Sequence, residues 1–140
     1  MKKILLCASL FLATAVSADG PWKFKAKSAD KKITLDIDLY EESIEVPDMD
    51  MFGPMNGYLS GVREAIYGTW AVTSCEVVDD SHAKLRLSND QGSDTQEVLL
   101  TLVGDSVCKV DLKGSVYIKK VVDGKKLQKI NPSFEVKKVK

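Results

Sequence analysis

The stretches WKFKAK, residues 22–27, and ITLDIDLY, residues 33–40, alternate apolar and polar side chains strictly, and this period of two decides the fold class. Successive side chains of a β-strand point to opposite faces, so the pattern predicts strands with one face on a core and the other in water. The pattern recurs in AKLRLS (83–88) and VCKVDLK (107–113), and turn signals such as Asp123-Gly124 separate the runs. The chain is therefore predicted to be all-β.

The expected architecture is an antiparallel meander of about 8–10 strands, since strands follow one another through short turns without intervening helices. Closing the sheet into a barrel, fully or partly, would bury one face of every strand and remove the exposed edges. A β-sandwich is the alternative. Its immunoglobulin version does not fit, because Trp70 precedes Cys75 instead of lying between the two cysteines Cys75 and Cys108.

One segment departs from the alternation: VPDMDMFGPMNGYLSGVREAIYG, residues 46–68, is rich in Gly, Pro and Met. We expect a loop over residues 47–56. A short helix of about two turns should follow, because one helical face would collect four apolar residues: Tyr58, Leu59, Val62 and Ile66.

The N-terminus has the pattern of a signal peptide, residues 1–18, with two lysines, an apolar run and the small-residue site Val16-Ser17-Ala18. The apolar run is too short to span a bilayer, so we do not expect an integral membrane protein. Cleavage after Ala18 would leave a single all-β domain, residues 19–140, in the bacterial periplasm or secreted. A lipoprotein anchored through Cys7 is the alternative, although Leu6 stands where a small residue is needed.

Cleavage would leave two cysteines, Cys75 and Cys108. Two cysteines in an exported chain predict a disulfide, and two buried free thiols are the alternative. Their wide spacing in the sequence does not favour a zinc or redox motif.

Gly20-Pro21-Trp22 resembles the Gly-x-Trp motif of the lipocalins, a group of small secreted β-barrels. The resemblance extends to chain length, the export signal and the meander. It implies a ligand-binding barrel in which Trp22 closes one end. The chain departs from the group in lacking its Thr-Asp-Tyr motif and a late arginine, since the two arginines are Arg63 and Arg86.

Few residues point to catalysis or to a cofactor. The one histidine, His82, follows Asp79-Asp80-Ser81 in a turn, and no serine lies in a nucleophile-elbow pattern. We therefore predict no enzyme and no cofactor, with a glycosidase that uses two carboxylates as the open alternative. We predict no metal either, because Asp48-Met49-Asp50 begins like a calcium loop but lacks its later oxygen ligands.

Charge is divided unevenly along the chain. Residues 34–105 hold fifteen acidic and three basic residues, whereas residues 113–140 hold nine lysines and two acids. If the sheet closes, the first and last strands become neighbours and form a basic face: Lys23, Lys25, Lys27, Lys137 and Lys138. Such a face suits an anionic lipid, a glycan or an acidic protein, and nucleic acid is not expected. The alternative is a solvated strand edge protected by lysines.

The second candidate site is the apolar part of the irregular segment: Met49, Met51, Phe52, Met55 and Tyr58. Methionine adapts its shape, so these residues suit the binding of an apolar small molecule. They could equally form a plug over the core.

Two functions follow from these patterns. The first is an exported binding protein that holds an apolar or amphipathic ligand at one end of the barrel, with residues 47–58 as its gate. The second is a protein- or envelope-interaction module, of an inhibitor-like kind, that uses its lysine-rich face and has no internal ligand. A barrel filled by its own side chains would favour the second.

Overall fold

The computed structural model describes residues 20–47, 49, 51, 53–89 and 94–139. The predicted signal peptide, residues 1–18, and the predicted site residue Phe52 lie outside these ranges. Within them, no helix is long and apolar enough to cross a membrane.

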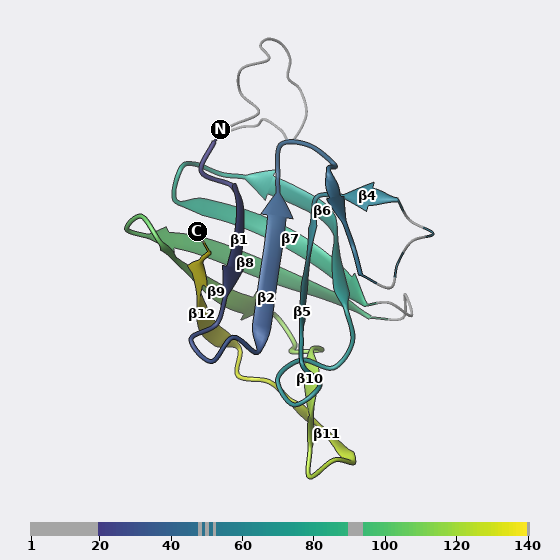
Figure 1. Ribbon diagram of the computed structural model, residues 1–140. Coiled ribbons are helices and arrows are strands. Elements are labelled where there is room, and N and C mark those ends of the chain that lie inside the picture. The colour runs from purple at the N-terminus through teal and green to yellow at the C-terminus, as the bar shows by residue number, and fades with distance from the viewer. Residues whose placement is uncertain (1–19, 48, 50, 52, 90–93, 140) are drawn as a thin grey trace.

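Eight antiparallel strands form a closed barrel in the order β1-β2-β5-β6-β7-β8-β9-β12, and β12 pairs with β1 to close it (Figure 1). The predicted closed meander is thus confirmed, and the sandwich is excluded. The barrel strands are β1 (Lys23–Lys27), β2 (Ile33–Asp38), β5 (Gly57–Gly61), β6 (Trp70–Val77), β7 (His82–Asn89), β8 (Thr95–Val103), β9 (Val107–Lys113) and β12 (Ser133–Lys138).

Two short ribbons interrupt the meander. Strands β3 (Ile44–Glu45) and β4 (Pro54–Met55) pair between β2 and β5, and strands β10 (Lys119–Val122) and β11 (Lys126–Lys129) pair between β9 and β12. The second ribbon projects from one end of the barrel, here called the hairpin end (Figure 1). At its tip Asp123 (φ 55°) and Gly124 (φ 71°) both adopt positive φ, as the Asp-Gly turn signal predicts.

The predicted short helix is wrong, because its first residues form strand β5. Tyr58 and Leu59 point to opposite faces of that strand, and both are buried. Two glycines let β5 approach β2 closely: a Cβ at Gly57 would overlap the carbonyl oxygen of Asp36, and one at Gly61 would overlap that of Lys32. Two buried faces and flanking glycines produce the clustered apolar pattern that resembles a helix.

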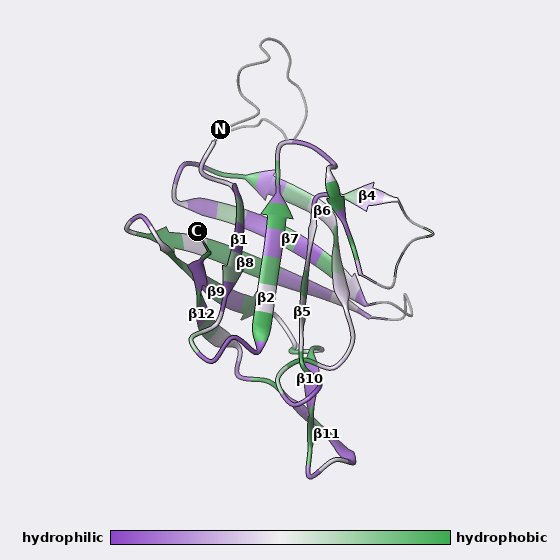
Figure 2. Ribbon diagram, viewed as in Figure 1, coloured by the Kyte–Doolittle hydropathy of each residue, from purple (hydrophilic) through white to green (hydrophobic). Residues whose placement is uncertain are grey.

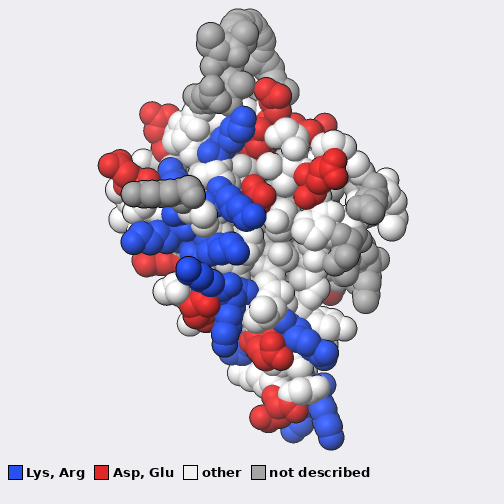
Figure 3. All heavy atoms as spheres, in the orientation of Figure 1, with Lys and Arg blue, Asp and Glu red and all other residues white. Residues whose placement is uncertain are grey.

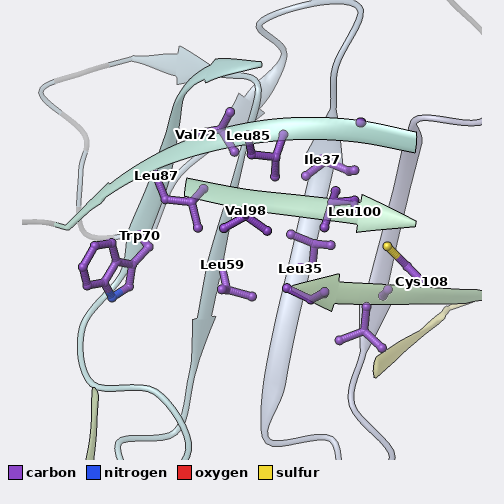
Figure 4. Close-up of a cluster of buried hydrophobic side chains, with 14 of the residues drawn as sticks. Leu35, Ile37, Leu59, Trp70, Val72, Leu85, Leu87, Val98, Leu100 and Cys108 are labelled. Carbon is purple, nitrogen blue, oxygen red and sulfur yellow. The ribbon is translucent and has the colours of Figure 1, made fainter. Parts of the chain in front are cut away.

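The barrel interior is packed with the protein's own side chains. Inward residues from all eight strands form one buried cluster, part of which Figure 4 shows. Figure 2 shows hydrophobic and hydrophilic residues alternating as green and purple bands along several of the barrel strands. The same cluster includes Trp22 and Leu39 at one end of the barrel, and at the hairpin end it includes three isoleucines: Ile66, Ile118 and Ile130.

The predicted disulfide is also wrong: Cys75 and Cys108 are not joined to each other. Cys75 lies on β6 and Cys108 on β9, with β7 and β8 between them. Neighbouring strands are about 4.8 Å apart, which separates the two along the wall by about 14 Å, whereas a disulfide requires Cα atoms within about 7 Å. Both side chains instead pack in the apolar interior.

Candidate functional site

The closure of the barrel brings two of the predicted basic-face residues together. β1 and β12 pair with Lys27 directly opposite Lys137. Residues directly opposed in an antiparallel pair point to the same face, so these two ammonium groups share the outer surface. Like charges in this position destabilise the sheet, because each lysine raises the electrostatic energy of the other.

Lys138 lies apart from that surface. It is opposite Ala26, which is fully buried, so the Lys138 side chain starts on the inward face of β12. Its Nζ atom lies 4.8 Å from the centre of the Phe24 ring. Lys138 therefore covers an aromatic side chain at the rim of the interior.

The other two first-strand lysines face acids on β2. Lys25 is opposite Asp36, and the Lys23 Nζ atom lies 3.9 Å from Oδ2 of Asp38. Burial raises the pKa of Asp36, and the positive charge of Lys25 opposes that shift. The charges of Lys23 and Lys25 are thus partly compensated by their neighbours.

Asp38 also has a structural role, because its buried carboxylate accepts three hydrogen bonds from the following turn. The backbone N–H groups of Tyr40 and Glu41 donate to Oδ1, both at 3.1 Å, and the Ser43 hydroxyl donates to Oδ2 at 2.7 Å. This carboxylate therefore orders the turn after β2 as well as facing a lysine.

A second lysine pair lies on the projecting hairpin, where Lys119 is directly opposite Lys129. The hairpin is fastened to residues 62–69, because the Tyr67 N–H donates to the Lys119 carbonyl oxygen at 2.7 Å and the Val121 N–H donates to that of Arg63 at 2.8 Å. The sequence indicates how many lysines this region holds, but the sequence analysis does not predict which of them lie opposite each other. The Asp123-Gly124 turn is the signal from which this pairing could have been predicted, because the position of a turn fixes which residues of a hairpin lie opposite each other.

The two ends of the barrel differ in charge. In the described parts of the connections at the hairpin end (28–32, 62–69, 94 and 114–132), eight basic residues accompany four acids. The connections at the opposite end, as far as they are described, carry six acids and no lysine or arginine: Glu41, Glu42, Glu45, Asp79, Asp80 and Asp105. Figure 3 shows lysine and arginine side chains over the β1–β12 side and continuing toward the hairpin.

Three of the predicted ligand-binding residues, Met49, Met55 and Tyr58, lie against the outside of the barrel wall. Met49 and Tyr58 belong to a second buried cluster with Val46 and Ala71, and Met55 packs against it. Because Tyr58 of β5 is opposite Ala71 of β6, this cluster covers the outer face of those strands. Met51 is 82% exposed and lies apart from it. The structure thus brings together three of the predicted ligand-binding residues, whose role in binding stays a prediction.

Gly20-Pro21-Trp22 seals the end of the barrel opposite the hairpin. Trp22 is completely buried, and its indole Nε1–H donates to the carbonyl oxygen of Asp79 in the β6–β7 turn at 2.8 Å. The Trp22 backbone N–H donates to the Tyr40 hydroxyl at 3.0 Å. Any Cβ at Gly20 would overlap that hydroxyl, so the glycine is required for this contact.

The same turn contains the histidine. Nδ1 of His82 lies 3.0 Å from Oδ1 of Asp79, and both side chains are exposed. The Ser81 N–H donates to the Asp79 carboxylate at 2.7 Å, and this bond, together with the one to His82, lowers the pKa of Asp79. In the part of the chain that the structure describes, no three His, Cys, Asp or Glu side chains are grouped to hold a metal ion.

Two hollows, of about 520 and 250 Å³, lie on the outer wall over β6 to β9. Both are lined by Arg86 and Glu97, which form an ion pair at 2.9 Å. Tyr117 is among the residues that line the larger one. They are therefore open surface grooves beside a salt bridge.

Burial at Cys108 predicts a pH-dependent stability. Removal from water raises the pKa of this thiol from 9.0 to about 12, and the charge of Lys138 offsets part of the shift. The unfolded chain releases the proton more easily, so the contribution of the thiol to stability is complete below pH 9 and is lost as the pH rises toward 12.

We expect the free energy of unfolding to fall by about 2 kcal/mol more in the wild type than in Cys108→Val between about pH 8 and about pH 10.5. Urea unfolding at both pH values measures this difference. Tyrosine and lysine titrations are common to both proteins and cancel. Equal losses in the two proteins would show that Cys108 does not titrate with a raised pKa.

In comparisons with known proteins, no family model, no curated protein and no solved structure matches this chain.

Proposed function

We propose that this protein is an exported interaction module that binds an anionic partner through a basic surface. This surface comprises the outward lysines of the β1–β12 pair, the 28–32 connection and the hairpin: Lys27, Lys31, Lys32, Lys119, Lys120, Lys125, Lys126, Lys129 and Lys137. The observation that carries the proposal is that two cross-strand pairs on this surface are lysine opposite lysine: Lys27 with Lys137 and Lys119 with Lys129.

Electrostatics supports this assignment. A like-charged pair directly across strands destabilises a sheet. An anionic partner would relieve that repulsion on binding, and its attraction would add to it. Lys23 and Lys25 contribute less to such a surface, because Asp38 and Asp36 already lie beside them.

The packed interior weighs against the other predicted function, an apolar ligand held inside the barrel. Side chains from all eight strands and from both ends meet in one cluster, which occupies the space such a ligand would need. The basic surface, in contrast, is accessible and needs no internal cavity.

We further infer a lipocalin-like kinship and export to the periplasm or the medium. In support of the kinship, the closed eight-stranded antiparallel barrel is preceded directly by Gly20-x-Trp22, and Trp22 is buried at one end. The missing late arginine and the filled interior depart from a ligand carrier of that kind. Residues 1–18 support export through their lysines, apolar run and small-residue site.

Binding to anionic and neutral partners at two salt concentrations tests the proposal. We expect the wild type to bind phosphatidylglycerol vesicles, heparin or polyglutamate, and to bind each more weakly as salt shortens the Debye length to less than about 10 Å. The double variant Lys27→Gln/Lys137→Gln should bind less tightly by about thirtyfold, on the basis of about 1 kcal/mol for each of the two lysines near an anionic surface.

The matched control is Lys23→Gln/Lys25→Gln, which removes the same charge from lysines that already face acids. We expect the control to lose clearly less affinity. Equal losses would mean that binding follows net charge alone, and the absence of binding to all three anionic partners would refute the proposed function.

A further inference from the structure

We infer that the partner of the basic surface is an anionic lipid bilayer, with the hairpin end facing the membrane; this inference rests on the proposed function. The supporting observation is that exposed apolar side chains accompany the lysines at this end. Tyr67 is 46% exposed, Tyr117 45% and Leu127 51%, and all three belong to the segments at the hairpin end, residues 62–69 and 114–132.

The hairpin combines both kinds of side chain on one face. Leu127 is opposite Val121, and Lys119 is opposite Lys129. Because alternate residues of a strand share a face, Leu127 and the two lysines point to the same side of the hairpin. Val121 is buried and Leu127, directly opposite it, is exposed, so this face carries an apolar pair beside its two lysines.

The backbone at both tyrosines is held in place by hydrogen bonds. The backbone N–H of Tyr67 is hydrogen-bonded to the hairpin through the Lys119 carbonyl oxygen at 2.7 Å. The backbone N–H of Tyr117 donates to Oε1 of Gln96, a fully buried side chain of β8, also at 2.7 Å. A preformed surface loses less conformational entropy on binding than a flexible one.

This combination matches the membrane interface more closely than a soluble polyanion. Tyrosine, leucine and the aliphatic stems of lysines partition into the boundary between head groups and acyl chains, while the ammonium groups reach anionic phosphates. A glycan or an acidic peptide chain would use the lysines but would leave Leu127 in water. The acidic connections at the opposite end would then point away from the anionic membrane.

Substitution of Leu127 separates the lipid inference from the proposed function. We expect Leu127→Ser to weaken binding to mixed phosphatidylcholine and phosphatidylglycerol vesicles by about tenfold, from the lost burial of one leucine side chain. Its binding to heparin and polyglutamate should be unchanged. The matched control is Val103→Ser, which changes an apolar residue of similar exposure, 52%, at the opposite end of the barrel, and its binding should equal that of the wild type.

A second readout reports insertion directly. In Leu127→Trp, we expect the tryptophan emission to shift to shorter wavelength on addition of the anionic vesicles but not on addition of heparin. If Leu127→Ser binds vesicles like the wild type and Leu127→Trp shows no shift, while the lysine variants still lose affinity, the lipid inference is overturned and the proposed function stands. If the wild type binds none of the anionic partners, the proposed function itself fails.

Discussion

Replacing Trp22 with alanine should lower the free energy of unfolding by about 3–5 kcal/mol, a large part of the stability of a domain of this size. The side chain is completely buried in the main cluster, so its removal would leave a cavity at the end of the barrel. The carbonyl oxygen of Asp79, which accepts the indole N–H at 2.8 Å, would lose that partner. Urea unfolding monitored by circular dichroism measures the change.

Trp22→Phe separates the two contributions. The phenyl ring keeps most of the apolar packing but cannot donate to Asp79, so we expect a loss of about 1–2 kcal/mol. If Trp22→Ala unfolds at the same urea concentration as the wild type, Trp22 does not seal the barrel. If Trp22→Phe is as unstable as Trp22→Ala, the hydrogen bond, and not the ring volume, carries the effect.

The fold was predictable because its signal is local and repeated. The period-two pattern of residues 22–27, 33–40, 83–88 and 107–113 assigns each side chain to the interior or the surface, and the structure has a barrel strand in each of these ranges. Closure then follows from the need to cover strand edges. None of these steps requires knowledge of contacts between distant residues.

The two incorrect predictions both depended on such contacts. A strand buried on both faces, like Tyr58-Leu59 between Gly57 and Gly61, has no alternation to reveal it. The disulfide prediction rests only on the compartment and on the number of cysteines. Their distance depends on how many strands separate β6 from β9, which becomes known only when the order of the strands is fixed.

The basic face was predictable in part, for a related reason. Closure alone places Lys27 near Lys137, whereas the compensation of Lys23 and Lys25 depends on the register between β1 and β2. The sequence already assigned Asp36 and Asp38 to the polar face of β2. Pairing that strand with its neighbour in sequence would have placed these acids beside the two lysines.

Gln96 gave no signal in the sequence, although it is central to the hairpin end. It lies on β8 opposite Leu87, an inward residue, and it is 1% exposed. Its amide Nε2 lies 3.2 Å from the carbonyl oxygens of Glu97, Lys113 and Ser115, and its Oε1 accepts the Tyr117 N–H at 2.7 Å. One side chain thus fastens residues 113–117 across the end of the barrel.

Replacing Gln96 with leucine should therefore destabilise the protein by about 2–4 kcal/mol, even though leucine is apolar and similar in size. The Tyr117 N–H and the carbonyl oxygens of Lys113 and Ser115 would lose a buried partner. Each unsatisfied group costs about 1–3 kcal/mol, and less where the segment can move toward water.

The same substitution at Gln128, which is exposed on β11, is the control and should change stability by less than about 0.5 kcal/mol. Urea unfolding compares the two variants, and native-state hydrogen exchange of the Tyr117 amide reports whether residues 113–117 have detached. Equal stability of Gln96→Leu and Gln128→Leu would mean that water replaces the amide without loss, and that the closure of this end depends on its isoleucines alone.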